Sequence, residues 1–432
     1  MGIARVTKTL YRPHPAPGAA ATVTAAYVGP GLERMEIHSQ EARVDVPSGS
    51  AMRLSADNGR TWSAFEPLPA TLSYPSGIEV WEGSGPKFYD GFAGVLVDGW
   101  LRQITETLDP PHEAAPPWSV PLLEGPGVPE GAWTRQLSYC VGRRYNDFAY
   151  YRLSWDHGRT WSPPYPFRYE DGEPFDPCDP LKPGFLHRNQ AYFGANFVRH
   201  SSGTLLHCLV HTYLPDDSRR DGAGRRRGTL CCIGRWDAAR QNYRWQMGRA
   251  VTVPPEVSQD GLDEPAVAEL QDGRVLVVWR GTNTETTPGR KWFSTSTDAG
   301  ATLTPVRELT YDDGSRFYSP SSIHQLLRHT VTGKLYWVGN ISPVPPRGNW
   351  PRYPLVIAEV DETSPAIKRG TVTVIDDRGP GQSPFVEFSN FSLLEDRQTH
   401  ELELYLTAYG ESLEHINNAN CYRYALALKE AR

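Results

Sequence analysis

The most regular feature of the chain is a series of short apolar segments, several with alternating polar and apolar residues, separated by Gly, Pro, Asn and Asp. Alternation with a period of two is typical of strands with one buried face, and no long window has the 3.6-residue period of an amphipathic helix. We expect strands at residues 21–28, 149–153, 203–210, 274–279, 334–338, 355–360, 401–407 and 422–428. The pattern predicts an all-β chain with almost no helix.

One short motif occurs three times and indicates how these strands are connected. The copies are residues 55–62, 154–161 and 296–303, and they share the pattern S-x-D-x-G-x-T-W, although Leu303 replaces the final Trp of the third. In such a turn the Asp accepts backbone N–H bonds and the Gly takes a positive φ. Asp57, Asp156 and Asp298 are therefore expected to shape hairpins rather than to catalyse a reaction.

The spacing of these turns predicts a propeller. Strands also run into Asp turns at Asp237 and Asp361, which gives five repeated units, and the strands after Phe385 supply a sixth. We expect the N-terminal strand, residues 5–11, to close the sixth unit, so that residues 1–432 form a single six-bladed β-propeller domain. The interval between the first two motif copies is the longest, and its Pro-rich stretch predicts a long loop at about residues 105–130.

The composition of the chain limits the classes of partner that we expect it to bind. The chain has 44 Lys and Arg against 50 Asp and Glu, a formal net charge of -6, so it has no bulk attraction to nucleic acid or to an anionic membrane. No stretch approaches the roughly 20 apolar residues of a membrane helix, and the first thirty residues lack an apolar run of signal-peptide length. We expect no nucleic-acid or membrane partner, and a cytoplasmic protein, or a secreted one if a signal has been removed.

The residues that bind metals or form disulfides have no recognisable pattern. Six cysteines are scattered without a C-x-x-C pair, which favours reduced, mostly buried thiols. His207 and His211 share one face of a strand, but no third ligand is evident. We expect neither a metal nor a cofactor.

Three copies of the turn motif in a chain with this strand content resemble the sialidase (neuraminidase) superfamily, whose six-bladed propellers carry such turns as Asp boxes, or BNR repeats. The resemblance spans most of the chain. It implies a carbohydrate-active enzyme, a glycoside hydrolase that acts as an exo-glycosidase on a glycan or oligosaccharide containing an acidic sugar.

The sharpest match runs from Asp263-Glu264-Pro265 to Trp279-Arg280. In sialidases the glutamate of the E-P pair is the base that activates a tyrosine nucleophile, and the arginine that ends the next strand binds the substrate carboxylate. The resemblance implies these roles for Glu264 and Arg280. The residue types suit the chemistry, because a guanidinium group binds a carboxylate through two parallel hydrogen bonds. The alternative is a buried ion pair that ties two strands together.

The resemblance implies three further positions. Arg352, with Arg347 as a competitor, would supply the second arginine of the clamp, and Arg12 in Tyr11-Arg12-Pro13 would supply the first-blade arginine, although the Ile of the family motif is missing. Asp45 would be the acid/base residue, because it lies shortly before the strand that enters the first motif copy. Two neighbours could replace Asp45: Glu36 and His38.

The sequence departs from the family at the nucleophile. Sialidases open the last blade with a Tyr-Ser pair, whereas this chain has Phe388-Ser389. A phenyl ring has no oxygen to attack an anomeric carbon, so a tyrosine mechanism fails if the alignment holds. Glu387 and Tyr318 are the candidate substitutes.

Two functions of other classes stay open. His187 and Arg188 precede a strand expected at residues 193–198, where an inner strand would begin near the axis. A histidine there could abstract the proton α to a uronate carboxylate while the arginine neutralises that carboxylate, which is the chemistry of a polysaccharide or oligosaccharide lyase, with His187 or Tyr318 as the base. The other function is a glycan-binding propeller without turnover.

Overall fold

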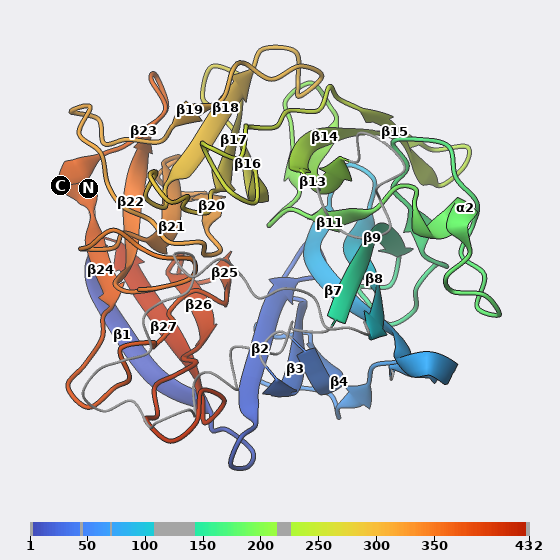
Figure 1. The fold of residues 1–432 in the computed structure, drawn as a ribbon, viewed down its shortest axis with the longest axis horizontal. Coiled ribbons are helices and arrows are strands. Elements are labelled where there is room, and N and C mark those ends of the chain that lie inside the picture. The colour runs from blue at the N-terminus through green and yellow to red at the C-terminus, as the bar shows by residue number, and fades with distance from the viewer. Residues whose placement is uncertain (1–2, 44–45, 70, 108–142, 214–225, 429–432) are drawn as a thin grey trace.

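The computed structural model of the chain describes residues 3–43, 46–69, 71–107, 143–213 and 226–428. In this part nearly every regular element is a strand, and six antiparallel sheets stand around a central axis as the blades of a propeller (Figure 1). The predicted all-β fold with six blades is confirmed. Of the Pro-rich loop predicted at about residues 105–130, residues 108–130 lie outside the described residues.

The first three blades follow the order of the chain. The first contains β2 (Ala20–Tyr27), β3 (Arg34–Arg43), β4 (Val46–Ser55) and β5 (Glu66–Pro67). The second contains β6 (Leu72–Tyr74), β7 (Ile78–Asp90), β8 (Val95–Thr107), β9 (Arg143–Ser154) and β10 (Tyr165–Pro166). The third contains β11 (Ala191–Phe193), β12 (Val198–Arg199), β13 (Leu205–Tyr213), β14 (Arg226–Asp237) and β15 (Asn242–Met247).

The last three blades complete the ring. The fourth contains β16 (Asp263–Glu269), β17 (Val275–Arg280), β18 (Lys291–Ser296) and β19 (Arg307–Glu308). The fifth contains β20 (Gln325–Arg328), β21 (Leu335–Asn340), β22 (Leu355–Asp361), β23 (Ala366–Ile367) and β24 (Thr373–Asp376). The sixth contains β25 (Phe391–Glu395), β26 (Leu402–Thr407), β27 (Cys421–Leu428) and β1 (Ile3–Arg12). The helical elements of the described residues are single turns: η1 (Pro75–Gly77), α2 (Pro183–Leu186) and η4 (Arg369–Thr371).

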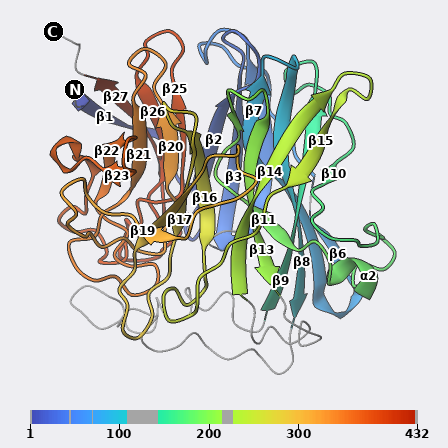
Figure 2. The same ribbon diagram turned by 90° about the horizontal axis from the view of Figure 1, so that it is seen from above.

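The first strand, β1, and the last strand, β27, lie side by side in the sixth blade (Figure 2). Strand β1 pairs antiparallel with β27, with Thr7 opposite Ala425, so the N-terminal strand covers the edge that β27 would otherwise expose. The predicted closure of the last blade by the N-terminal strand is confirmed. Because this pairing joins residues more than 400 positions apart, it fastens the first and last parts of the chain into one ring.

The core lies between the blades, where apolar side chains of neighbouring sheets interlock. Trp279 and Trp337 are completely buried, and so are the central residues of β17 and β21. Removal of this apolar surface from water is the dominant favourable term in folding. None of the helices in the described ranges is long and apolar enough to cross a membrane.

The three motif copies fold into the same turn. In each, one carboxylate oxygen of the Asp accepts the backbone N–H of the Thr four residues later at 2.8 Å, and the other accepts its hydroxyl at 2.6 Å. The Gly of each copy has a positive φ, between 81° and 90°. These bonds hold the pKa of Asp57 at about 2. The third copy keeps every one of these bonds without the final Trp, so the Asp, Gly and Thr make the turn.

One strand prediction is wrong. Residues 193–198 do not form a continuous strand, because the chain leaves the ladder after Phe193 and re-enters it at Val198. Between them Ala195 donates its N–H to the Pro265 carbonyl, and the side chain of Asn196 exchanges two hydrogen bonds with the backbone of Val267. The segment therefore bonds to the neighbouring blade as well as to its own, where Gly194 donates its N–H to the Cys208 carbonyl.

Candidate functional site

The register of the fourth blade fixes which residues share an end. Asp263 pairs with Arg280, and Arg280 pairs with Lys291, whereas Glu269, Val275 and Ser296 meet at the other end, beside the motif turn. Charged residues of β16, β17 and β18 therefore gather at the end opposite that turn. We call this end of the propeller the axial face, and we use the term for the corresponding strand ends of the other blades.

Glu264 lies at the start of the innermost strand of this blade in an unusual backbone conformation. Its φ is 45°, in the left-handed region that residues other than Gly seldom occupy, and the ladder is irregular between Asp263 and Ala266. One carboxylate oxygen accepts a bond from Arg280 Nη1 at 2.8 Å. The other is buried, with no hydrogen-bond partner among the described residues.

Arg280 is held between two carboxylates. Its Nη2 lies 3.3 Å from Asp263 Oδ2, and Arg227 of β14 binds the same oxygen. Burial opposes ionisation of Asp263, but the two guanidinium groups outweigh it and lower its pKa. Burial likewise opposes the charge on Arg280, but Glu264 and Asp263 prevail and raise its pKa. The charged forms of Asp263, Arg227 and Arg280 are therefore favoured.

Arg352 lies just before β22, in the next blade. Its Nη1 donates to Glu387 Oε2 at 2.6 Å and to Ser389 Oγ at 3.1 Å, and its Nη2 donates to the Ser321 carbonyl at 2.7 Å. The backbone carbonyl of Arg352 in turn accepts the N–H of Phe388. These contacts join the fifth and sixth blades.

Lys291, which the sequence analysis missed, connects the two arginines. Its side chain is completely buried, and its Nζ donates to the carbonyls of Pro320 and Ser322, on either side of the carbonyl that Arg352 binds. Burial, followed by the charges of Arg280 and Arg352, lowers the pKa of this amine well below its ordinary value, although Glu264 opposes the shift. The sequence carries no distinct signal for this residue, because a lysine at the start of a strand is usually exposed.

Phe388 points away from this cluster. Its ring is completely buried in the apolar core with Val338, Leu355 and Leu404, while its neighbours Glu387 and Ser389 contact Arg352. Strand-like alternation explains the difference, because successive side chains point to opposite sides. Phe388, which stands where the family has its nucleophile, thus contributes no group to the axial face. Glu387, the residue before it, is the acidic side chain closest to it in the sequence.

The remaining candidates of the sequence analysis have other contacts, are exposed or are not described. Arg12 ends β1 and donates to the carbonyl of Ser39 at 2.9 Å, and burial lowers its pKa. The ring of Tyr318 lies 4.5 Å from the guanidinium carbon of Arg290. Asp45 lies outside the described residues, and Arg347 is exposed.

His187 and Arg188 are not at the axis. They follow α2, which lies at the outer rim of the propeller in Figure 1, and Arg188 pairs with Glu170 at 3.0 Å. The two residues do precede β11, the innermost strand of the third blade, but that strand starts only at Ala191, and the helical turn at residues 183–186 places them away from the axis.

The structure offers no candidate metal site within the ranges it describes: no group of three or more His, Cys, Asp or Glu side chains is arranged to hold an ion. His207 and His211 are both buried, and burial lowers the pKa of each to about 4. His207 Nδ1 lies 2.9 Å from the Asn196 carbonyl, and its ring stacks on Phe197. Both are packed as neutral rings in the third blade.

Comparisons with known proteins identify the fold. No protein-family model matches the chain, and no curated protein matches it in sequence. Among solved structures, a Dyadobacter fermentans protein of unknown function is similar over 99% of this chain and 100% of that one, with a TM-score of 0.58 and 15% identity. The NanB sialidase of Streptococcus pneumoniae is similar over 99% of this chain and 71% of its own, with a TM-score of 0.56 and 13% identity.

A third structure agrees. The intramolecular trans-sialidase of Ruminococcus gnavus is similar over 94% of both chains, with a TM-score of 0.52 and 12% identity. Structural similarity at sequence identities this low establishes the fold of the backbone but leaves the activity open. The chain has the sialidase-like fold of a six-bladed β-propeller.

Proposed function

We propose that this protein is a glycoside hydrolase that acts on a glycan containing an acidic sugar, with its reaction site on the axial face around Glu264, Arg280 and Arg352. The fold supports the coarser part of the proposal, a glycan-active propeller enzyme, because its structural neighbours include a sialidase and an intramolecular trans-sialidase. The finer part is argued from the side chains.

The observation that carries the proposal is the state of Glu264. A positive φ at a residue other than Gly costs about 1–2 kcal/mol, and such strain persists where the surrounding structure imposes it, often at functional sites. Here it accompanies a carboxylate that has one oxygen paired with Arg280 and the other buried without a partner among the described residues. A buried acceptor without a donor is costly, so a reacting hydroxyl or water would find a strong acceptor there.

Glycoside hydrolysis commonly uses two carboxyl groups that flank the bond to be cleaved. We assign one to Glu264, as the group that accepts a proton or assists at the anomeric carbon. Glu387 is our candidate for the second, because its carboxylate lies 2.6 Å from Arg352 Nη1, beside the other charged groups of the cluster. Asp45 stays a candidate for the acid.

The arginines would hold the carboxylate of the sugar. Arg280 and Arg352 come from neighbouring blades, and the Nε atom of each is buried without a partner in the described part of the chain. Lys291 and Arg352 together bind three successive carbonyls, of Pro320, Ser321 and Ser322, so Lys291 is a positioning residue that fixes the separation of the two arginines.

A second candidate substrate is a neutral glycan, and the charge balance favours it. Arg227 and Arg280 are matched by Asp263 and Glu264, and Arg352 is matched by Glu387, while burial lowers the pKa of Lys291, so the arginines of the described cluster bring no excess positive charge. The lyase alternative has less support, because one of its two proposed bases, His187, lies beside α2 at the outer rim.

The test is a panel of fluorogenic glycosides of acidic and neutral sugars, assayed with the wild type, Glu264→Gln and Glu362→Gln. Loss of a general acid or base typically slows turnover by about 10²- to 10⁴-fold, so we expect Glu264→Gln to lose at least about 100-fold on its substrate. Glu362 is the control, because it also pairs with an arginine, Arg328 at 2.6 Å, and its variant should keep full activity. Hydrolysis that survives Glu264→Gln would refute the assignment.

A further inference from the structure

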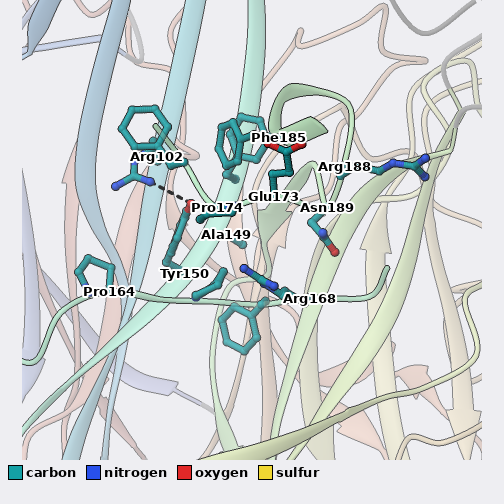
Figure 3. A pocket seen from close by; sticks show the side chains of 14 residues that line it. Arg102, Ala149, Tyr150, Pro164, Arg168, Glu173, Pro174, Phe185, Arg188 and Asn189 are labelled. Atoms are coloured by element: carbon teal, nitrogen blue, oxygen red, sulfur yellow. Dashed lines mark hydrogen bonds between the residues drawn. The ribbon is translucent and has the colours of Figure 1, made fainter. Parts of the chain in front are cut away.

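A pocket beside α2, in the second blade, is lined mainly by aromatic residues, prolines and arginines (Figure 3). It encloses about 250 Å³, between β9 and β10 on one side and the segment around α2 on the other. We call it the rim pocket. Its lining residues are Arg102, Phe148, Ala149, Tyr150, Pro164, Pro166, Phe167, Arg168, Glu173, Pro174, Phe175, Phe185, Arg188 and Asn189.

Aromatic rings and prolines form an apolar wall. Phe148 stacks on Phe185 with ring centres 4.3 Å apart, and the guanidinium carbon of Arg102 lies 3.9 Å from the ring centre of Phe175. Arg102 also donates to the hydroxyl of Tyr150 at 2.9 Å. Such contacts restrict the rotamers of the wall, so the shape of the pocket is largely fixed before any ligand binds.

The charges of the rim pocket do not balance. Glu82 neutralises Arg102, Glu170 neutralises Arg188, and Lys182 neutralises Glu173. Arg168 is exposed and makes no hydrogen bond or ion pair with any described residue. Its guanidinium group points toward Tyr150, whereas that of Arg188 points away from it (Figure 3). One uncompensated positive charge is therefore directed into a pocket with apolar walls.

The polar groups around this charge are a mixture of donors and acceptors. Asn189 uses its side-chain oxygen to accept the N–H groups of Tyr169 and Glu170, and its NH₂ group has no partner within the described ranges. Burial raises the pKa of Tyr150, so its hydroxyl stays a donor. Glu173 supplies an acceptor. A ligand with hydroxyl groups can use both kinds of partner, because each hydroxyl donates and accepts hydrogen bonds. An aromatic carboxylate without hydroxyl groups would have no donor for Glu173.

From this juxtaposition we infer that the rim pocket is a second ligand site, which binds one acidic sugar unit through Arg168 while the apolar face of the ring packs on the aromatic wall. The volume suits a single unit rather than an oligosaccharide. In taking the ligand to be a sugar the inference rests on the proposed function, and it adds a subsite remote from the reaction site. A glycan with several acidic units could engage both sites at once and gain avidity.

The test is titration of the full chain with D-glucuronate, N-acetylneuraminate and D-glucose, followed by crystal structures with each sugar. We expect an acidic sugar in the rim pocket, with binding there weakened about tenfold or more in Arg168→Ala, because a hydrogen bond to a charged group is lost. Arg159→Ala removes another exposed arginine of the same blade and should change nothing. Thermal melts check that both variants are folded.

The axial variant Arg280→Lys separates this inference from the proposed function. Rim binding that persists in Arg280→Lys and disappears in Arg168→Ala supports the rim site whether or not the axial face turns over a glycan. An acidic sugar seen only at the axial face, equal affinity of wild type and Arg168→Ala, or no binding of any of the three sugars would overturn the rim site.

Discussion

Two glutamates that pair with arginines, Glu36 in the first blade and Glu264 in the fourth, differ in how many other hydrogen bonds they accept. Glu36 accepts bonds from Tyr11 at 2.6 Å, from His38 at 2.9 Å and from Arg53 at 2.6 Å, and it is completely buried. Glu264 has one donor, and its side chain is 18% exposed. Glu36 has its hydrogen-bonding capacity filled by protein groups, and Glu264 does not.

The surroundings reinforce the contrast. Tyr11 comes from β1 and reaches Tyr405 of β26, so Glu36 helps to close the ring between the first and last blades. Burial opposes the ionisation of Glu36, but its donors prevail and lower its pKa. The comparison teaches that an arginine–carboxylate pair is not by itself evidence of a site: the evidence is a pair with capacity left over, in a strained backbone.

The largest expected effect is on stability at Glu36. Removal of one partner from a buried ionic network typically costs about 3–5 kcal/mol, so Glu36→Ala should lower the free energy of unfolding by that amount. Glu264→Ala should cost clearly less, because it removes a single donor contact. Urea denaturation of both variants measures the difference, and equal losses would break the comparison.

Acid should destabilise the protein through the third blade. The pKa of His207 is about 4 in the folded chain against 6.5 as its ordinary value, so the unfolded chain binds the proton first as pH falls. Stability is therefore lost between about pH 6.5 and 4, by about 3 kcal/mol from this residue. Urea denaturation across this range should give a shallower slope for His207→Met than for wild type. An unchanged slope would show that other groups dominate.

The smallest effect should come from a motif turn. Asp298 makes its bonds to Thr302 at an exposed hairpin, far along β18 from the axial face. Asp298→Ala should cost about 1–2 kcal/mol, since each lost hydrogen bond contributes about 0.5–1.5 kcal/mol. Activity measured at a temperature where the variant is fully folded should match that of the wild type. A selective loss of turnover would mean that the two ends of the blade are coupled.

The sequence predicted the blades because their determinants are local. Alternating strands and the Asp-x-Gly-x-Thr spacing contain their own hydrogen-bond partners, so each copy specifies its turn without reference to the rest of the chain. The resemblance also brought Glu264, Arg280 and Arg352 forward, and all three lie at strand ends on the axial face.

What the sequence could not predict depends on contacts between blades. Lys291 looks like any polar residue at a strand start, and its burial becomes evident only when Pro320 and Ser322 are brought against it. His187 looked axial because α2 and the interrupted strand that follows it have no strong periodic pattern. The different directions of the Arg168 and Arg188 side chains likewise become evident only when the segment around α2 has folded.

The most direct test of the account is the affinity for an acidic sugar of Arg280→Lys and Arg34→Lys, both made in the Arg168→Ala background so that the rim pocket does not contribute. Both arginines are paired with carboxylates, Arg34 with Glu403 at 2.9 Å in the interface between the first and last blades. The account predicts that Arg280→Lys weakens D-glucuronate about tenfold or more relative to D-glucose, while Arg34→Lys lowers stability and leaves the affinity unchanged. Equal affinities for Arg280→Lys and its parent, or a loss of the same size in folded Arg34→Lys, would contradict it.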